Sequence, residues 1–192
     1  MNKPLFLFVG RSASGKTTMA NILERHYEYK TVQSYTTRKP RYDGETGHIF
    51  VNKEEFDNLG ELAAYTLYNG NEYGTTFEQL RECDIYVIDV PGVETLLNNY
   101  EKIDRPIYII YFEASVSTCI DRMIDRNSSD MEIVSRLRND HKFDWKDSLD
   151  KLVWHNSKNL NKNIELYTAN ANLSKNEVLD QVLYYMQRYM EV

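Results

Sequence analysis

Leu5-Phe6-Leu7-Phe8-Val9 leads without a break into Gly10-Arg11-Ser12-Ala13-Ser14-Gly15-Lys16-Thr17-Thr18, and this stretch decides the fold. Its apolar half is a continuous run, which predicts a strand buried on both faces, as in a parallel sheet. Its second half matches the pattern GxxxxGK[ST], and apolar residues then recur at helical spacing. A strand, a glycine-rich turn and an amphipathic helix in this order predict a phosphate-binding loop in an α/β protein.

The residue types of this loop suit phosphate chemistry. Gly10 and Gly15 permit a strained turn whose backbone N–H groups face inward, and the following helix adds its positive N-terminal end. Lys16 can place its ammonium against the β and γ phosphates, and the Thr17 hydroxyl can bind Mg²⁺. The alternative is an ordinary glycine-rich turn. We expect the following loop residues to contact a nucleoside triphosphate: Gly10, Ser12, Ala13, Ser14, Gly15, Lys16, Thr17 and Thr18.

The rest of the chain continues the α/β pattern. Apolar runs at 85–88 and 107–112 predict further strands of the same sheet, and helical spacing follows the first of them at Val93, Leu96 and Leu97. This alternation predicts a three-layer α/β/α sandwich with a parallel core sheet. Short candidate strands with Asp-Gly and Asn-Gly turns between 34 and 76 predict a small antiparallel insertion.

Helices are expected in the second half of the chain. The patterns over 116–126 and 131–155 predict helices, and the polar break between them is rich in residues that cap helix N-termini. This arrangement predicts a mobile helical tip. A capping box at Ser174-Lys175-Asn176-Glu177 precedes a last amphipathic helix, whose apolar stripe we assign to the core.

Composition limits the possible partners. The 192 residues carry 23 Lys and Arg against 29 Asp and Glu, a formal charge of -6, which argues against nucleic acid as a partner. The first residues lack the long apolar run of a secretory signal, so we expect a cytoplasmic protein with no membrane partner. We expect the protein to be either a monomer or a homodimer. Cys83 and Cys119 lack partners at metal-binding spacing, and we interpret them as free thiols.

A phosphate-binding loop is shared by switch GTPases, ATPase motors and small-molecule kinases, so the loop alone does not define a function. Asp89-Val90-Pro91-Gly92 resembles the DxxG of switch GTPases. The Asn-Lys-x-Asp motif that those proteins need for guanine is absent, since Asn52-Lys53-Glu54-Glu55 lacks the aspartate. The sequence therefore argues against a switch.

A second candidate anion site lies in the stretch Ser34-Tyr35-Thr36-Thr37-Arg38-Lys39-Pro40-Arg41. Three of its last four residues are cationic, although the chain as a whole is anionic. Arginine forks bind phosphate oxygens bidentately, so Arg38 and Arg41 suit a dianionic phosphate. The alternative is a solvated basic loop.

With this stretch the sequence resembles guanylate kinase, a family of nucleoside monophosphate kinases that transfer a phosphoryl group from ATP to GMP. The motif Ser-x-Thr-Thr-Arg-x-Pro-Arg, then Gly44-Glu45, His48-Ile49-Phe50 and Asn71-Glu72-Tyr73-Gly74-Thr75, carries the likeness. The resemblance implies acceptor-phosphate contacts from Arg38, Arg41, His48 and Tyr73. It implies acceptor-base contacts from Ser34, Thr75 and Asp89. From the residues alone, Tyr73 and Thr75 are typical of a hairpin surface, and Asp89 could simply cap the next helix.

The same resemblance assigns the donor side and the lid. Arg122, Arg126 and Arg136 would cover the transferring phosphoryl group, and Asn170 would approach adenine. The residue-level alternatives are a solvated charged face and a plain loop asparagine. Lys16, Arg38, Arg41, Arg126 and Arg136 form the expected catalytic set, acting through charge and placement without a general base.

Of several departures from the family pattern, which include His48 in place of a tyrosine, one matters more than the rest. The glutamate that accepts from the guanine N–H groups aligns with Ala64, so base identity is open. The leading prediction is an ATP-dependent kinase for GMP or dGMP that uses Mg²⁺. The alternatives are a kinase of the same fold for another or modified nucleotide or a phosphosugar, and a non-catalytic binding module. We expect one domain over 1–192, with core segments 1–33, 77–126 and 137–192, an acceptor-binding insertion 34–76 and a lid 127–136.

Overall fold

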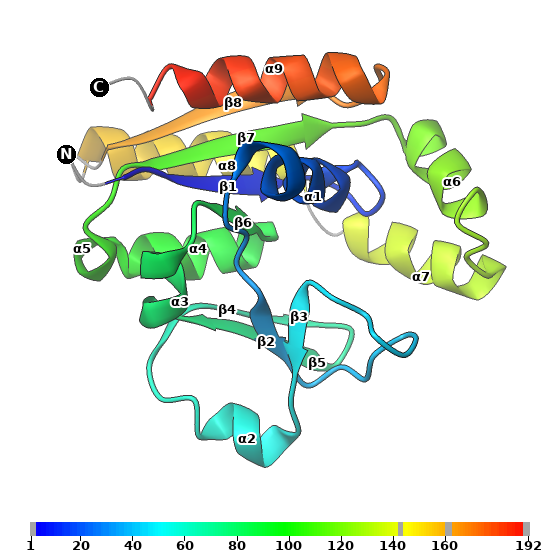
Figure 1. The fold of residues 1–192 in the computed structure, drawn as a ribbon, viewed down its shortest axis with the longest axis horizontal. Helices are drawn as coiled ribbons and strands as arrows, with labels where there is room; N and C mark the ends of the chain where they lie inside the picture. Colours follow the sequence, from blue (N-terminus) through cyan, green and yellow to red (C-terminus); the bar gives the residue numbers. More distant parts are fainter. Residues whose placement is uncertain (1–2, 142–143, 160–162, 190–192) are drawn as a thin grey trace.

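The computed structural model describes residues 3–141, 144–159 and 163–189. Its centre is a sheet of four parallel strands in the order β6-β1-β7-β8 (Figure 1). The strands are β1 (Leu5–Val9), β6 (Ile85–Val87), β7 (Ile107–Glu113) and β8 (Ile164–Asn170). The parallel core sheet confirms the predicted fold class. The edge strand β8 has an interrupted apolar pattern and did not emerge from the sequence.

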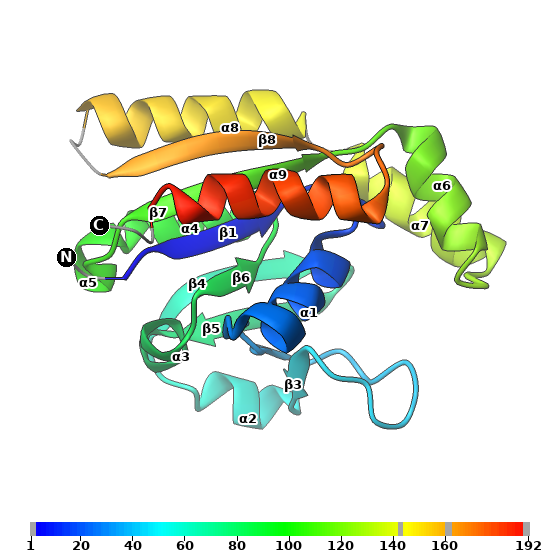
Figure 2. The same ribbon diagram turned by 45° about the horizontal axis from the view of Figure 1, so that its top comes forward.

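Helices cover both faces of this sheet, which gives the predicted three layers (Figures 1 and 2). One face packs against α1 (Lys16–Tyr27), α6 (Val116–Ile124) and α9 (Lys175–Gln187). The other packs against α3 (Phe77–Glu82), α4 (Val90–Asn98), α5 (Tyr100–Ile103) and α8 (Trp145–Trp154). Among the described residues, no helix combines the length and apolar character needed to span a membrane.

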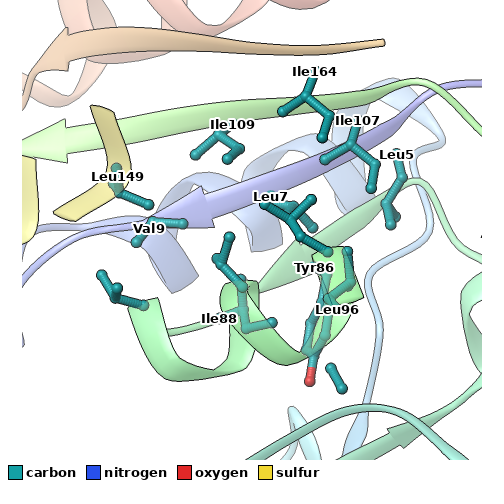
Figure 3. Close-up of a cluster of buried hydrophobic side chains, with 14 of the residues drawn as sticks. Leu5, Leu7, Val9, Tyr86, Ile88, Leu96, Ile107, Ile109, Leu149 and Ile164 are labelled. Atoms are coloured by element: carbon teal, nitrogen blue, oxygen red, sulfur yellow. The ribbon is translucent and has the colours of Figure 1, made fainter. Parts of the chain in front are cut away.

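Strand β1 shows why the sheet lies in the middle of the core. All five of its side chains are buried, and successive side chains point to opposite faces. Leu5, Leu7 and Val9 enter one apolar cluster, shown in Figure 3, and Phe6 and Phe8 enter the other. The continuous apolar run therefore forms a strand buried on both faces, as predicted.

A second sheet, in the order β3-β2-β5-β4, forms the insertion. Its strands are β2 (Ser34–Thr36), β3 (His48–Phe50), β4 (Leu62–Tyr68) and β5 (Asn71–Thr76), and α2 (Lys53–Asp57) lies between β3 and β4. β5 runs antiparallel to β2 and β4, and β3 joins the edge parallel to β2. The β4–β5 hairpin turns at Asn69 and Gly70, which have φ of 51° and 73°. Both residue types tolerate positive φ, so the Asn-Gly signal places this turn correctly.

The helical region after β7 is divided further than its sequence pattern suggests. α7 covers Asp130–Asp140, and a new helix, α8, begins at Trp145, with residues 142–143 of the expected pattern outside the described residues. The Asp144 side chain accepts from the backbone N–H of Asp147 and caps α8, and the Trp145 ring N–H donates to the carbonyl of Asp140. A five-residue π-helical segment, η1 (His155–Asn159), ends this region. An N-cap inside the expected pattern explains the division.

Candidate active site

The phosphate-binding loop joins β1 to α1 in a conformation that requires glycine. A Cβ on Gly10 would lie 2.7 Å from the carbonyl oxygen of Phe112 and 2.9 Å from Ser14 Oγ. Gly15, at the start of α1, has φ 104°, in the left-handed region. Both glycines are therefore needed for the loop to curl back on itself at the carboxyl end of β1.

Lys16 begins α1 and folds over this loop. Its Nζ donates to the carbonyl oxygens of Gly10 and Arg11, each at 2.7 Å. Burial lowers the pKa of Lys16 to about 8, although the nearby carboxylates of Asp140 and Asp89 act to raise it. The ammonium is thus held against the loop carbonyls, and with this pKa it is mostly charged at pH 7.

A cleft of about 530 Å³ opens beside Lys16, between the loop, the second sheet and α7. Ten of the residues that the sequence assigned to the site line it: Gly10, Ser12, Lys16, Ser34, Arg38, Arg41, His48, Tyr73, Asp89 and Arg136. These residues come from the core around β1 and α4, from the second sheet and its loops, and from α7. The structure therefore brings together groups up to 126 positions apart in the chain, as Gly10 and Arg136 are.

Two arginines of the insertion meet at one carboxylate. Arg38 donates to both oxygens of Glu45, at 2.8 and 3.1 Å, and its guanidinium lies over the Phe50 ring. Arg41 donates its backbone N–H to Glu45 at 2.7 Å and places its side chain 3.4 Å from the same carboxylate. Burial raises the pKa of Glu45, but the bonds from Arg38 and Arg41 outweigh it and hold that pKa below its usual value. Glu45 thus fixes both arginines at the cleft.

The cationic groups converge on this cleft. Burial lowers the pKa of Arg41, and the positive charges of Arg38 and Arg136 lower it further, so α7 brings its arginine close to the insertion. Among the described residues, the Nε of Arg38 is one of two buried side-chain polar atoms without a hydrogen-bond partner. A guanidinium that is fixed on one edge by Glu45 and unpartnered at Nε fits an added anion.

Other predicted residues lie outside the lining of the cleft. Arg122 on α6 donates to the carbonyl oxygens of Ser14 at 3.1 Å and of Ala171 at 2.8 Å, so it ties the phosphate-binding loop to the end of β8. Arg126 is exposed, and its charge acts to lower the pKa of Lys16. The remaining predicted residues outside the lining are Ala13, Ser14, Gly15, Thr17, Thr18, Thr75 and Asn170.

The donor set around Thr17 fits magnesium. Thr17 is exposed in the first turn of α1, next to Lys16, and offers a hydroxyl oxygen. Within the described part of the chain, no three His, Cys, Asp or Glu side chains gather to hold a metal ion. Mg²⁺ prefers hard oxygen ligands and is commonly held by one or two protein groups together with substrate phosphates. One hydroxyl beside a phosphate-binding loop matches that mode of binding.

Asp140 is a site residue that the sequence analysis missed. It lies at the end of α7, is only 2% exposed, and accepts from the backbone N–H of Ser12 at 3.0 Å. Burial raises the pKa of Asp140, and the hydrogen bonds from Ser12 and the charge of Lys16 oppose that rise. The contact links α7 to the phosphate-binding loop. A charged residue one turn beyond Arg136 looks like solvated helix surface, so the sequence offers no sign of this contact.

The other end of the cleft is polar and partly aromatic. Ser34 Oγ lies 3.0 Å from His48 Nδ1, and His48 packs edge-on against Tyr73. Burial lowers the pKa of His48, and the charge of Arg38 lowers it further, so the imidazole is neutral near pH 7.

Asp89 caps α4, which is the role that the residues alone suggested, and it also lines the cleft. One of its oxygens accepts from the Gly92 N–H at 2.9 Å and caps α4, and the other accepts from the Thr66 hydroxyl at 3.1 Å at the cleft. Thr66, Tyr68 and Tyr86 also line the cleft and were not anticipated. Alternation along a short strand does not reveal which of its faces meets a cleft.

The loop, the arginine-lined cleft and the covering helix define a phosphate-binding-loop protein of nucleotide-kinase type. The chain is 31% identical over 144 residues to a guanylate kinase of Geobacter metallireducens, covering 69% of this chain and 70% of the relative. It is 25% identical over 166 residues to a guanylate kinase of Fusobacterium nucleatum, covering 79% of this chain and 88% of the relative. No profile of a known protein family matches. The chain belongs to the guanylate kinase family.

Proposed function

We propose that this chain is an ATP-dependent nucleoside monophosphate kinase that transfers the γ-phosphoryl group of ATP to GMP or dGMP. The observation that carries the proposal is the position of Arg38, Arg41 and Arg136 in the same cleft as Lys16. The names of its relatives support guanine nucleotide as the acceptor. We also propose the division into core, insertion 34–76 and lid 127–136, with α7 as the moving part.

The chain's own residues act by placement and charge. An acceptor phosphate is already ionised, so no general base is needed. The guanidinium groups of Arg38 and Arg41 hold the acceptor phosphate, and Lys16 leaves its two loop carbonyls for the β and γ phosphates of the donor. Arg126 and Arg136 neutralise the charge that develops between the two phosphates.

The metal would be held by Thr17 together with the phosphates of ATP. When bound there, Mg²⁺ supplies charge neutralisation at the β and γ phosphates. Closure of α7 over the cleft excludes water and so protects ATP from idle hydrolysis. Asp140 keeps α7 in register with the loop through Ser12.

A coupled assay of ADP release tests the proposal against all ribo- and deoxyribonucleoside monophosphates, with Lys16→Met as the matched control. We expect wild-type activity with at least one acceptor and a loss of about a thousandfold or more in the variant. No ADP release with any acceptor would refute kinase activity. If calorimetry also detected no binding of magnesium-ATP, the proposed function would become that of a non-catalytic binding module.

A second acceptor is favoured by the position of Ala64. This side chain is fully buried and lies in the apolar core cluster, where the family places a glutamate that reads guanine. The same kinase with a different base preference therefore remains an explicit second candidate. Competition of GMP, dGMP, dTMP and AMP for one enzyme sample separates the two candidates. A guanylate kinase phosphorylates GMP and dGMP in preference to the others, whereas a kinase with a different base preference does not.

A further inference from the structure

Tyr86 closes the end of the cleft beyond Asp89. It lies on β6, lines the cleft and is 5% exposed. Its hydroxyl accepts a hydrogen bond from Thr75 Oγ1 at 2.8 Å. Figure 3 shows the ring extending away from Leu5 and Leu7, with its oxygen directed toward the strands of the second sheet. Tyr86 thus crosses from the core sheet to the insertion.

The β4–β5 hairpin shows what Tyr86 covers. Two cross-strand pairs on one face of the hairpin line the cleft, Tyr68 with Asn71 and Thr66 with Tyr73. The next pair on that face, Ala64 with Thr75, is fully buried and does not line the cleft. Because Tyr86 is hydrogen-bonded to Thr75 and itself lines the cleft, its phenol stands between this pair and the cleft. The lining residues at this end therefore carry three polar groups, the Tyr86 hydroxyl, the Asp89 carboxylate and the Thr66 hydroxyl.

The hydrogen bond also fixes what that hydroxyl can offer. Thr75 is the donor, so the phenol keeps its own proton for a second partner. Burial raises the pKa of Tyr86, which keeps the phenol protonated at neutral pH. An anionic acceptor is what the family uses to bind guanine N–H groups. At Tyr86 the cleft offers a neutral donor beside the Asp89 carboxylate, and such a donor pairs with an acceptor atom on a ligand.

We propose that Tyr86 determines base specificity by donating its hydroxyl proton to a carbonyl oxygen of the acceptor's base. The preferred acceptors are then nucleotides of oxo bases, the 6-oxopurines and 4-oxopyrimidines. Bases with an amino group at the corresponding position, as in AMP and CMP, place a donor against a donor and are rejected. This inference rests on the proposed function, since it assumes that a nucleoside monophosphate occupies the cleft.

The test compares wild type with Tyr86→Phe, which keeps the ring and removes the hydroxyl. The matched control is Tyr185→Phe on α9, which loses a hydroxyl that donates to the carbonyl of Thr168 on β8, outside the cleft. Steady-state kcat/KM is measured for GMP, dTMP, UMP, AMP and CMP. We expect wild type to favour the oxo bases, and Tyr86→Phe to lower kcat/KM for them by about tenfold. The ratio of kcat/KM for oxo-base nucleotides to kcat/KM for amino-base nucleotides should shrink in parallel. KM for ATP should not change, and the control variant should keep the wild-type values.

Calorimetric binding of the same nucleotides without ATP separates the two proposals. If wild type binds oxo-base nucleotides without turnover and Tyr86→Phe weakens that binding, the specificity inference stands and the kinase proposal fails. If the oxo-to-amino ratio is equal in wild type and variant, the inference is overturned while the kinase stands. If no nucleotide binds, both are overturned. Should Tyr86→Phe fail to fold, Thr75→Val serves as the second variant, because it removes the donor that orients the phenol. The ratio of kcat/KM for oxo-base to amino-base nucleotides should shrink in this variant as well.

Discussion

The titration of Lys16 gives a prediction that can be worked out in numbers. In the proposed function its ammonium holds the phosphates of ATP, and burial lowers its pKa to about 8. A lysine with a lowered pKa is charged below that value and neutral above it, so affinity for magnesium-ATP is full at low pH and lost as pH rises. For one essential proton the apparent Kd increases by about tenfold between pH 7 and pH 9. The phosphates of ATP are already ionised over this range and contribute little.

Calorimetry of magnesium-ATP binding from pH 7 to pH 10 measures this dependence. Lys16→Arg is the matched control, since a guanidinium stays charged throughout, and its affinity should be lower but independent of pH. A wild-type affinity that stays constant up to pH 9.5 would refute the reasoning. It would mean that the two loop carbonyls which accept from Lys16 stabilise the ammonium more than burial destabilises it.

Three further substitutions test the site and its support. Asp140→Asn removes a carboxylate that raises the pKa of Lys16, so the midpoint of the pH profile should move below about 8; an unmoved midpoint would contradict this. Arg38→Lys loses bidentate binding and should lower kcat/KM for the acceptor by about 100-fold with ATP affinity unchanged, as steady-state kinetics would show. Gly10→Ala places a Cβ 2.7 Å from the Phe112 carbonyl, and urea unfolding should reveal a loss of about 1–3 kcal/mol; an unchanged midpoint would speak against that clash.

The fold was predictable where local patterns are strong. The β1 run, the glycine-rich loop and α1 follow directly from apolar continuity and from glycine placement, and the Asn-Gly turn at 69–70 fixes the β4–β5 hairpin. Strand β8 escaped because it lies at the edge of the sheet, where only part of its residues are buried. The division between α7 and α8 escaped because one capping aspartate, Asp144, decides it.

The site was predictable to the extent that motifs encode it. The loop and the arginine stretch are short-range patterns, and the structure places Lys16, Arg38 and Arg41 in one cleft. Asp140 and Tyr86 become visible only in three dimensions, because each contacts a residue of another element, Ser12 and Thr75 respectively. No periodicity or spacing carries information about such contacts, which depend on how α7 and the insertion pack against the core.

The acids of the cleft explain how an anionic chain maintains a cationic site. Glu45 fixes Arg38 and Arg41, and the carboxylates of Asp140 and Asp89 raise the pKa of Lys16. Burial lowers the pKa of Arg41, and the positive charges of Arg38 and Arg136 lower it further, because like charges repel. Buried carboxylates offset that repulsion and hold each cation at its place before any phosphate arrives. Phosphates that enter such a site then meet cations already oriented, which is the electrostatic preorganisation that phosphoryl transfer requires.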